Sequence, residues 1–386
     1  MINRAVLMMS VVCLVSPMTL AQALGGDTEW AAIGAVGNRG FDRARPDFPR
    51  LGRGAVNYPY RLAVHEVTTA QWIEFMNAVN GLDEHGDLLR DPLFWGGRYD
   101  GNTPDGGRRV ALVESLGPNA ALLPVSGIGW RLGARFVNWL HNGKLADPAT
   151  LGNGVYDTST FGNPDDGPFT DILSPAPGAQ YWIPTFDEWI KAVHYDPERV
   201  NEDESLGGWW YGPHGSDELP LAGLPWVGGE TSGGLDLEVN EAPPVGSYAA
   251  RTPWGLADAS GGVMEWTSSI WVEKTFTNQR LIIDGSSMYH DDSNALILDY
   301  LYLNGAEFIA GGIPSLGLRL AATALAEVPC AADFNADGLV EFADLRQFVE
   351  SFLNRDPASD LNGDGVVDFG DIMRFVEAYV RGCDPS

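Results

Sequence analysis

Two twelve-residue stretches near the C-terminal end of the chain place oxygen-bearing side chains at the same positions. These are positions 1, 3, 5, 9 and 12 of each stretch, with a glycine at position 6. A calcium ion needs six to eight oxygen ligands and a residue that tolerates a sharp turn in the middle of the loop. The spacing therefore predicts two calcium ions. The alternative is a pair of surface turns without metal, because Asn, Asp and Gly dominate turns in general.

The side-chain ligands predicted for the first loop are Asp333, Asn335, Asp337, Glu341 and Asp344, and the carbonyl of Leu339 completes the set. Those predicted for the second loop are Asp360, Asn362, Asp364, Asp368 and Asp371, with the carbonyl of Val366.

Each loop is followed by the same apolar pattern, and the second copy begins 27 residues after the first. Its positions i, i+3, i+4, i+7 and i+8 form one face of a helix. They hold Leu345, Phe348, Val349, Phe352 and Leu353 in the first copy and Ile372, Phe375, Val376, Tyr379 and Val380 in the second. No helix pattern precedes the first loop, because Pro329 stands just before it. We expect a small all-α domain of two loop–helix units.

A duplicated loop–helix with Asp at position 12 resembles a dockerin, the module that docks secreted bacterial proteins onto a partner. The resemblance covers residues 333–380 and implies a protein partner of the cohesin type. Dockerins often carry small hydroxylic residues at loop positions 10 and 11. This chain has Phe342-Ala343 and Phe369-Gly370 there, which leaves the identity of the partner open.

The N-terminal segment and the cysteines indicate an oxidising compartment. Residues 1–23 have a basic start, an apolar run and a small-residue ending, which predicts a secretory signal peptide. A membrane anchor is the alternative, but the apolar run is short and interrupted. A lipoprotein signal at Cys13 is disfavoured by the bulky residue before it. We expect a secreted bacterial protein, extracellular or at the cell surface, with no membrane span after cleavage.

The other two cysteines, Cys330 and Cys383, stand at the two ends of the calcium repeats. In an oxidising compartment we expect them to form a disulfide. A closed loop of about 54 residues would contribute roughly 4 kcal/mol in the chain-entropy model. So small a domain needs a covalent link or metal to fold by itself. We therefore place the tail domain at residues 330–383.

Composition limits the function of the remainder. The formal net charge is −28 and the pI is about 4.3, which argues against nucleic acid, because phosphates require a basic surface. The 13 Trp all precede residue 272, and most are expected in the core. Helices are predicted over 70–79, 130–140 and 186–192, with a capping residue at Thr68 or Thr69 and a capping box of Thr185 and Glu188. The loops between them are long, which is typical of functional segments.

Short motifs along residues 60–321 resemble the formylglycine-generating-enzyme (sulfatase-modifying factor) family. They are YRLAVHEVT at 60–68, WIEFMN at 72–77, PVSGIGW at 124–130, IPTFDEW at 183–189, SGGVMEWTS at 260–268 and GLRLA at 317–321. The resemblance implies an α+β fold for residues 27–325, related to C-type lectins, with little regular secondary structure and structural calcium.

One calcium site of the family can be carried over by this resemblance. Asp258 and Glu265 match its side-chain ligands, and Gly261 and Val263 match its carbonyl ligands. Two carboxylates around a Gly-Gly turn can wrap one hard cation. The alternative is that Glu265 pairs with an arginine such as Arg319. We expect one or more calcium ions in the large domain.

The oxidases of the family hold copper with two cysteines near the end of the domain. Soft thiolates are the ligands that Cu(I) selects. In the matching stretch of this chain those places fall at Tyr289 and about Asn294, and residues 27–325 contain no cysteine. Copper and catalysis by the family mechanism are therefore not expected.

These patterns favour a secreted ligand-binding module with an unknown ligand, tethered to a protein partner through its calcium-binding tail. The alternative is an oxidoreductase or hydrolase with a remodelled site around Tyr289 and His290, in a candidate pocket that also includes Asn294. Copper or iron in the purified protein would favour the enzyme, and calcium alone would favour the binding module.

Overall fold

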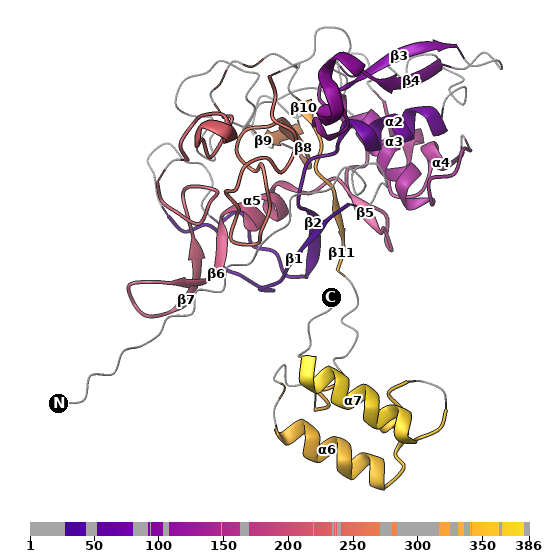
Figure 1. Ribbon diagram of the computed structural model, residues 1–386, viewed down its shortest axis with the longest axis vertical. Coiled ribbons are helices and arrows are strands. Elements are labelled where there is room, and N and C mark those ends of the chain that lie inside the picture. Colours follow the sequence, from indigo (N-terminus) through magenta and orange to yellow (C-terminus); the bar gives the residue numbers. More distant parts are fainter. Residues whose placement is uncertain are drawn as a thin grey trace. The chain divides into compact units, whose positions relative to one another are not determined.

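The computed structural model describes residues 28–43, 52–79, 92, 94–102, 108–147, 149–162, 170–218, 220–233, 235, 237, 241–270, 280–283, 316–324, 331–335, 340, 342–362 and 365–381. The chain divides into two compact units, residues 1–323 and 324–386, and each is described by itself (Figure 1). The predicted signal peptide lies outside the described residues, and the predicted domain boundaries stay predictions. Within the described part, no helix has the length and apolar character required to cross a bilayer.

The large unit mixes helices and sheets, as the sequence predicts. A four-stranded antiparallel sheet is built in the order β1–β2–β11–β5. Its strands are β1 (Trp30–Ile33), β2 (Tyr60–Ala63), β5 (Tyr181–Trp182) and β11 (Ala321–Thr323). In its register Leu62 faces Ala31 on one side and Ala321 on the other. The first and last described strands of the large unit, β1 and β11, thus lie in one sheet.

A three-stranded sheet contains β8 (Met264–Ile270) between its two neighbours. Strand β10 (Leu316–Gly317) pairs with it in parallel and β9 (Arg280–Ile283) in antiparallel orientation. Two hairpins complete the strands: β3 (Gly97–Asn102) with β4 (Arg108–Leu112), and β6 (Tyr195–Val200) with β7 (Leu206–Trp209). Turns and irregular segments connect these short elements, so side chains of distant residues can meet between them.

Three longer helices lie at the predicted places: α2 (Thr69–Ala78), α3 (Trp130–His141) and α5 (Phe186–His194). Thr68 caps α2 and forms a capping box with Gln71. Thr185 and Glu188 form the predicted capping box of α5. Each box satisfies backbone N–H groups that the first helical turn cannot pair. Shorter helical turns are η1 (Glu114–Leu122), α4 (Ala149–Gly152), η2 (Thr158–Thr160) and η3 (Pro225–Val227).

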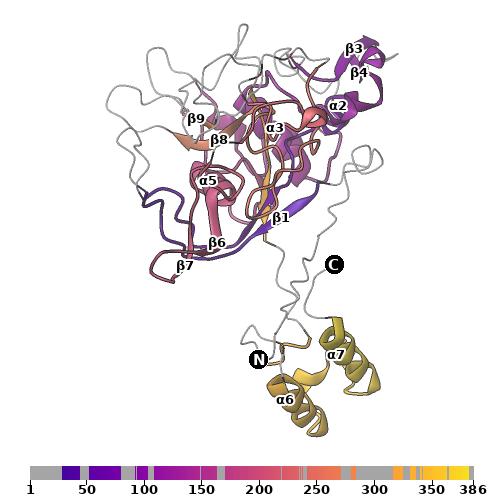
Figure 2. The ribbon, with the colours of Figure 1, turned by 60° about the vertical axis from the view of Figure 1, so that its left-hand side comes forward.

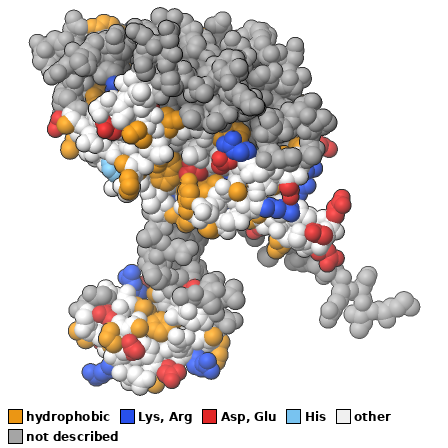
Figure 3. Space-filling view, turned by 180° about the vertical axis from the view of Figure 1, so that it is seen from behind, with side chains coloured by type: hydrophobic (Ala, Val, Ile, Leu, Met, Phe, Trp, Pro, Cys, Tyr) orange, Lys and Arg blue, Asp and Glu red, His pale blue; other side chains and the backbone are white. Residues whose placement is uncertain are grey.

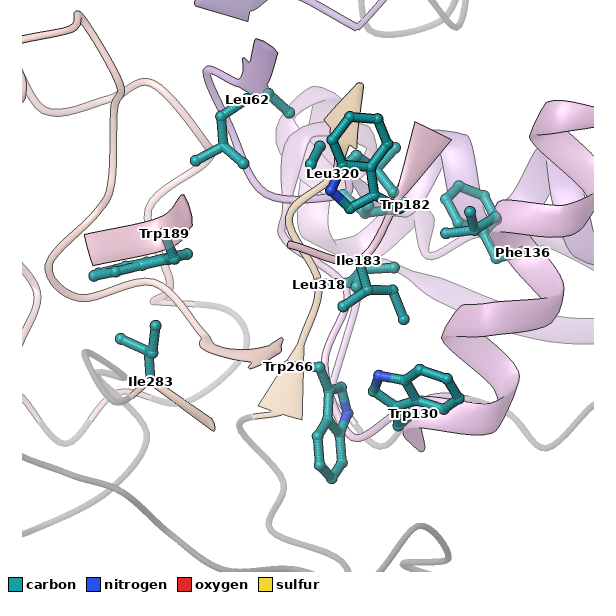
Figure 4. Close-up of a cluster of buried hydrophobic side chains, with 14 of the residues drawn as sticks. Leu62, Trp130, Phe136, Trp182, Ile183, Trp189, Trp266, Ile283, Leu318 and Leu320 are labelled. Atoms are coloured by element: carbon teal, nitrogen blue, oxygen red, sulfur yellow. The ribbon is translucent and has the colours of Figure 1, made fainter. Parts of the chain in front are cut away.

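Aromatic side chains from α2 and α3 pack against one another in the core. Trp72 and Phe136 have ring centroids 5.1 Å apart, and Phe75 and Trp139 are 5.3 Å apart. Further core members are Trp130, Ile183, Trp266 and Leu318 (Figure 4). The expectation that most tryptophans are buried is met by those in the described core, with Trp226 as an exception at 64 % exposure.

The C-terminal unit contains the two predicted helices, α6 (Phe342–Leu353) and α7 (Phe369–Arg381), and a short turn η4 (Pro357–Ser359). The helices lie side by side in both ribbon views (Figures 1 and 2). Phe348 and Phe375 stack between them, with ring centroids 4.3 Å apart and planes 5° apart. These two residues occupy equivalent positions of the two repeats. The sequence duplication is therefore also a duplication of packing.

Candidate functional site

A buried arginine organises the region to which the sequence assigns a calcium site. Arg319, between β10 and β11, has no exposed surface, and Glu265 on β8 is 2 % exposed. The Nε and Nη2 atoms of Arg319 lie 2.9 and 2.8 Å from Oε1 of Glu265. Nη1 donates to the carbonyls of Ala63 and Val64 at 3.0 and 2.6 Å. One guanidinium thus joins β8 to the last residue of β2 and to the residue that follows it.

The second oxygen of Glu265 is also engaged. Its Oε2 accepts a hydrogen bond from the indole Nε1 of Trp189 at 2.5 Å. Glu265 therefore makes the ion pair with Arg319 that the sequence leaves open as the alternative to calcium. A cation bound by Glu265 would compete with Arg319 and with the indole N–H of Trp189 for the same carboxylate. The described residues contain no group of three His, Cys, Asp or Glu side chains that could hold a metal ion. The calcium assignment to Asp258, Gly261, Val263 and Glu265 stays a prediction.

The turn that carries Asp258 wraps closely around this cluster. Oδ2 of Asp258 accepts from the backbone N–H of Gly246 at 2.5 Å and lies 3.6 Å from Nδ1 of His65. Gly262 has a φ of 68°, and a Cβ there would lie 2.0 Å from Oε1 of Glu66. Only glycine fits both the backbone conformation and the space. The Gly-Gly pair read from the sequence as a metal-binding turn therefore also permits close approach to Glu66.

Glu66 is the member of this cluster that sequence reasoning missed. It is 2 % exposed, and its Oε1 accepts from the backbone N–H of Val263 at 3.2 Å. Burial raises the pKa of Glu66 well above its ordinary value, and the nearby Asp258 carboxylate raises it further, while Arg319 opposes both. Its Oε2 is buried without a hydrogen-bond partner among the described residues. In the sequence, Glu66 is one residue of the YRLAVHEVT motif at 60–68 and follows His65, and neither feature indicates a buried carboxyl group.

A cavity of about 10 Å³ adjoins His65 and Glu66. A space of this size is at the lower limit for one water molecule. A bound water there would give the buried carboxyl group a partner. The cavity has no room for a larger ligand.

A larger hollow lies elsewhere on the large unit. It is a surface groove of about 420 Å³ that is lined by Leu116, Asn119, Leu123, Leu224, Trp226, Leu237, Glu241, Ala242 and Pro244. Its volume falls in the range typical of sites for small molecules, which are mostly apolar with a few polar groups. Nothing in the sequence indicates this groove, because the wall formed by Leu116, Asn119 and Leu123 lies about 100 residues before the other lining residues.

Several of the predicted site residues lie outside the described part of the chain. Tyr289, His290 and Asn294 lie outside the described residues, as do Cys330 and Cys383. Of the predicted calcium ligands, Asp337, Leu339, Glu341 and Asp364 also lie outside them. The remaining ligands of the two tail loops are described.

The position-12 carboxylates hold the backbone of both tail loops. Asp344 and Asp371 are fully buried. Oδ1 of Asp344 accepts from the N–H of Asn335 at 3.0 Å. Oδ1 of Asp371 accepts from the N–H groups of Leu361 and Asn362 at 2.8 and 3.1 Å. Both carboxylates therefore bind the start of their own loop, in the same way in each repeat.

The second loop is closed further by its position-1 and position-6 residues. Oδ2 of Asp360 accepts from the N–H of Gly365 at 2.8 Å, and Gly365 has a φ of 85°. Burial acts to raise the pKa of Asp371, but the N–H donors of Asp368, Asn362 and Leu361 outweigh it and lower that pKa. A carboxylate that favours its ionised form is the kind of ligand that a calcium ion requires. Calcium in this loop stays a prediction, because Asp364 lies outside the described residues and the described ones form no group of three His, Cys, Asp or Glu side chains that could hold a metal ion.

The sequence model of the Sulfatase-modifying factor enzyme 1-like domain (FGE-sulfatase) matches residues 37–323. No curated protein matches the chain. A solved structure described as "Crystal Structure of CarF" has 17% sequence identity and a TM-score of 0.45, with 78% of this chain and 99% of that chain covered. The Treponema denticola variable protein 1 has 15% identity and a TM-score of 0.40, with 76% of this chain and 95% of that chain covered. With both TM-scores under 0.5, neither structure supports an inference about this chain.

Proposed function

The chain belongs to the family of Sulfatase-modifying factor enzyme 1-like domains, and we propose that its large domain binds a ligand without the oxidase chemistry of the formylglycine-generating enzymes. One observation carries the proposal. The matched stretch, residues 37–323, contains no cysteine, since the three cysteines of the chain are Cys13, Cys330 and Cys383. Thiolates are the ligands that select Cu(I). A domain without them lacks the groups that hold the oxidase metal.

The buried cluster around Arg319 then has a structural role. Its carboxylates and carbonyls fix the turn that carries Asp258 against β2 and β8. Calcium at Asp258, Gly261, Val263 and Glu265 remains part of the proposal, in the place where the family resemblance puts it. Ligand binding is assigned to the surface groove, because its volume and its mostly apolar lining are typical of small-molecule sites.

For the tail we propose a dockerin-like module that binds two calcium ions and docks onto a protein partner. Support comes from the doubled ligand set and from the buried Asp344 and Asp371, whose carboxylates hold their loops in the same way. When bound, calcium would neutralise the clustered carboxylates and draw them to one centre. Apolar side chains remain exposed on this unit beside charged ones (Figure 3). Secretion and a Cys330–Cys383 disulfide belong to the same proposal.

Metal content tests the proposal for the large domain. The purified full chain is incubated with Cu(I), dialysed and analysed for copper, iron and calcium. We expect calcium and no stoichiometric copper or iron. The double variant Tyr289→Cys/Asn294→Cys restores a thiolate pair and serves as the comparison for copper uptake. Near-stoichiometric copper or iron in the wild type would overturn the proposal and favour a remodelled enzyme around Tyr289 and His290.

A further inference from the structure

The walls of the surface groove are held in place by hydrogen bonds between segments. The N–H of Val245 donates to the carbonyl of Leu122 at 2.9 Å, which joins the residue after Pro244 to the end of η1. The buried Leu123 forms part of the lining, and its carbonyl accepts from the N–H of Thr69 at 2.8 Å. The groove is therefore built on the capped start of α2. Such a site is largely formed before a ligand arrives.

The third wall is a short closed loop with an apolar tip. Two hydrogen bonds hold its ends together. The N–H of Gly223 donates to the carbonyl of Thr231 at 2.9 Å, and the N–H of Glu230 donates to the carbonyl of Leu221 at 2.7 Å. The turn η3 lies between them and presents Trp226, which is 64 % exposed. A tryptophan on a pinned loop loses little conformational freedom when it binds a ligand. Leu221 and Val227 of the same loop are also exposed, at 63 % and 74 %, and exposed apolar residues that gather in one place mark binding sites.

The chemistry of the lining limits the ligand. Six of the lining side chains are aliphatic or Pro: Leu116, Leu123, Leu224, Leu237, Ala242 and Pro244. The polar and aromatic members are Asn119, Trp226 and Glu241, and no basic residue is among the described lining. An indole face and a carboxylate both favour a cation. The net charge of −28 raises the local concentration of cations further.

We infer that this groove binds a small amphipathic cation, namely a protonated or quaternary amine on an apolar body. The apolar body occupies the aliphatic walls, and the ammonium group contacts Trp226 and Glu241, which both line the groove. A neutral sugar would leave most of its hydroxyl groups against aliphatic carbon, which is unfavourable. This inference rests on the proposed function, since it names the class of ligand for the same domain.

The test uses three probes with the same six-carbon chain and different charge: hexyltrimethylammonium, hexanol and hexanoate. Each is titrated into the full chain by isothermal calorimetry at low and high salt. We expect the ammonium probe to bind at least about tenfold more tightly than hexanol, hexanoate to bind least, and the preference to shrink with salt. Equal binding of the three probes, or no binding of the ammonium probe, would overturn the inference.

Two variants locate the site. Trp226→Ala and Glu241→Gln change exposed side chains, and each should lower the affinity for the ammonium probe by about fivefold. Glu202→Gln removes an exposed carboxylate outside the lining and should leave binding unchanged. An unchanged affinity in Trp226→Ala would overturn the assignment to the groove. The copper measurement distinguishes failure of the proposed function from failure of the inferred ligand class. Copper uptake by the wild type refutes the proposed function. If the wild type binds neither copper nor the ammonium probe, only the ligand class is refuted.

Discussion

Arg319 and Glu265 form an ion pair at 2.8 Å in which both side chains are almost completely excluded from solvent. Removing one partner of a buried pair leaves the other charge uncompensated, which costs about 3–5 kcal/mol. Arg319→Met should therefore lower the free energy of unfolding of the large domain by that amount. Urea unfolding followed by tryptophan fluorescence measures it.

The control for that variant is Arg98→Ala, because Arg98 is half exposed and pairs with Asp100 at 3.6 Å. A change below about 1 kcal/mol is expected for such a surface pair. If Arg319→Met were as mild as Arg98→Ala, the buried cluster would not be the clamp between β2 and β8 that we describe.

Asp371 gives the clearest test of calcium in the tail. Asp371→Asn keeps an oxygen atom but removes the charge that a calcium ligand set requires. Calorimetry on the full chain should show one calcium equivalent fewer than the wild type. Asp356→Asn is the matched control, because Asp356 caps η4 outside both loops and its loss should leave the calcium count unchanged. An equal count in the wild type and in Asp371→Asn would contradict the site.

Cys330 and Cys383 should be linked in protein recovered from an oxidising compartment. The expected stabilisation by the closed loop is about 4 kcal/mol. Peptide mapping by mass spectrometry without reductant identifies the linked pair directly. Two free thiols in such material would rule the disulfide out.

Lys191 introduces a pH dependence of stability at alkaline pH. It is fully buried, its Nζ donates to the carbonyl of Ala35 at 3.1 Å, and burial lowers the pKa of Lys191 from 10.5 to about 8. Between these two values the unfolded chain binds a proton that the folded chain lacks. Stability therefore rises with pH over this interval, by about 3 kcal/mol at most.

Lys191→Met should remove this rise and stabilise the protein at neutral pH. Urea unfolding from about pH 7 to pH 10 measures the difference. Lys144→Met controls for the loss of one positive charge, since Lys144 is partly exposed and paired with Glu74 at 2.8 Å. Parallel pH profiles for the wild type and Lys191→Met would contradict the assignment.

Local features could be predicted from the sequence, and features that depend on distant contacts could not. The sequence predicts Thr68 or Thr69 as the cap of α2 and the capping box of Thr185 and Glu188 in α5, because a cap and its helix are only a few residues apart. The tail helices were predicted because their apolar period repeats within one segment. Glu66 was missed because its burial arises from contact with Gly262 and Val263 far along the chain. The groove was missed for the same reason.

The buried cluster around Arg319 could be predicted only in part. The sequence allowed two roles for Glu265, a calcium ligand or a partner of Arg319, and only the three-dimensional arrangement reports the ion pair. Neither composition nor spacing contains that information, because Glu265 and Arg319 are 54 residues apart. Their contact depends on the parallel pairing of β10 with β8, which places the segment after β10 beside Glu265.

The most direct test of the account is a turnover assay on the wild-type full chain. The protein is incubated with Cu(I), oxygen and a peptide containing Cys-x-Pro-x-Arg, and mass spectrometry follows conversion of the cysteine to formylglycine. We predict no aldehyde product, because residues 37–323 contain no cysteine that could bind copper. Catalytic formation of the aldehyde by the unmodified protein would contradict the binding-module account and identify an oxidase with different metal ligands.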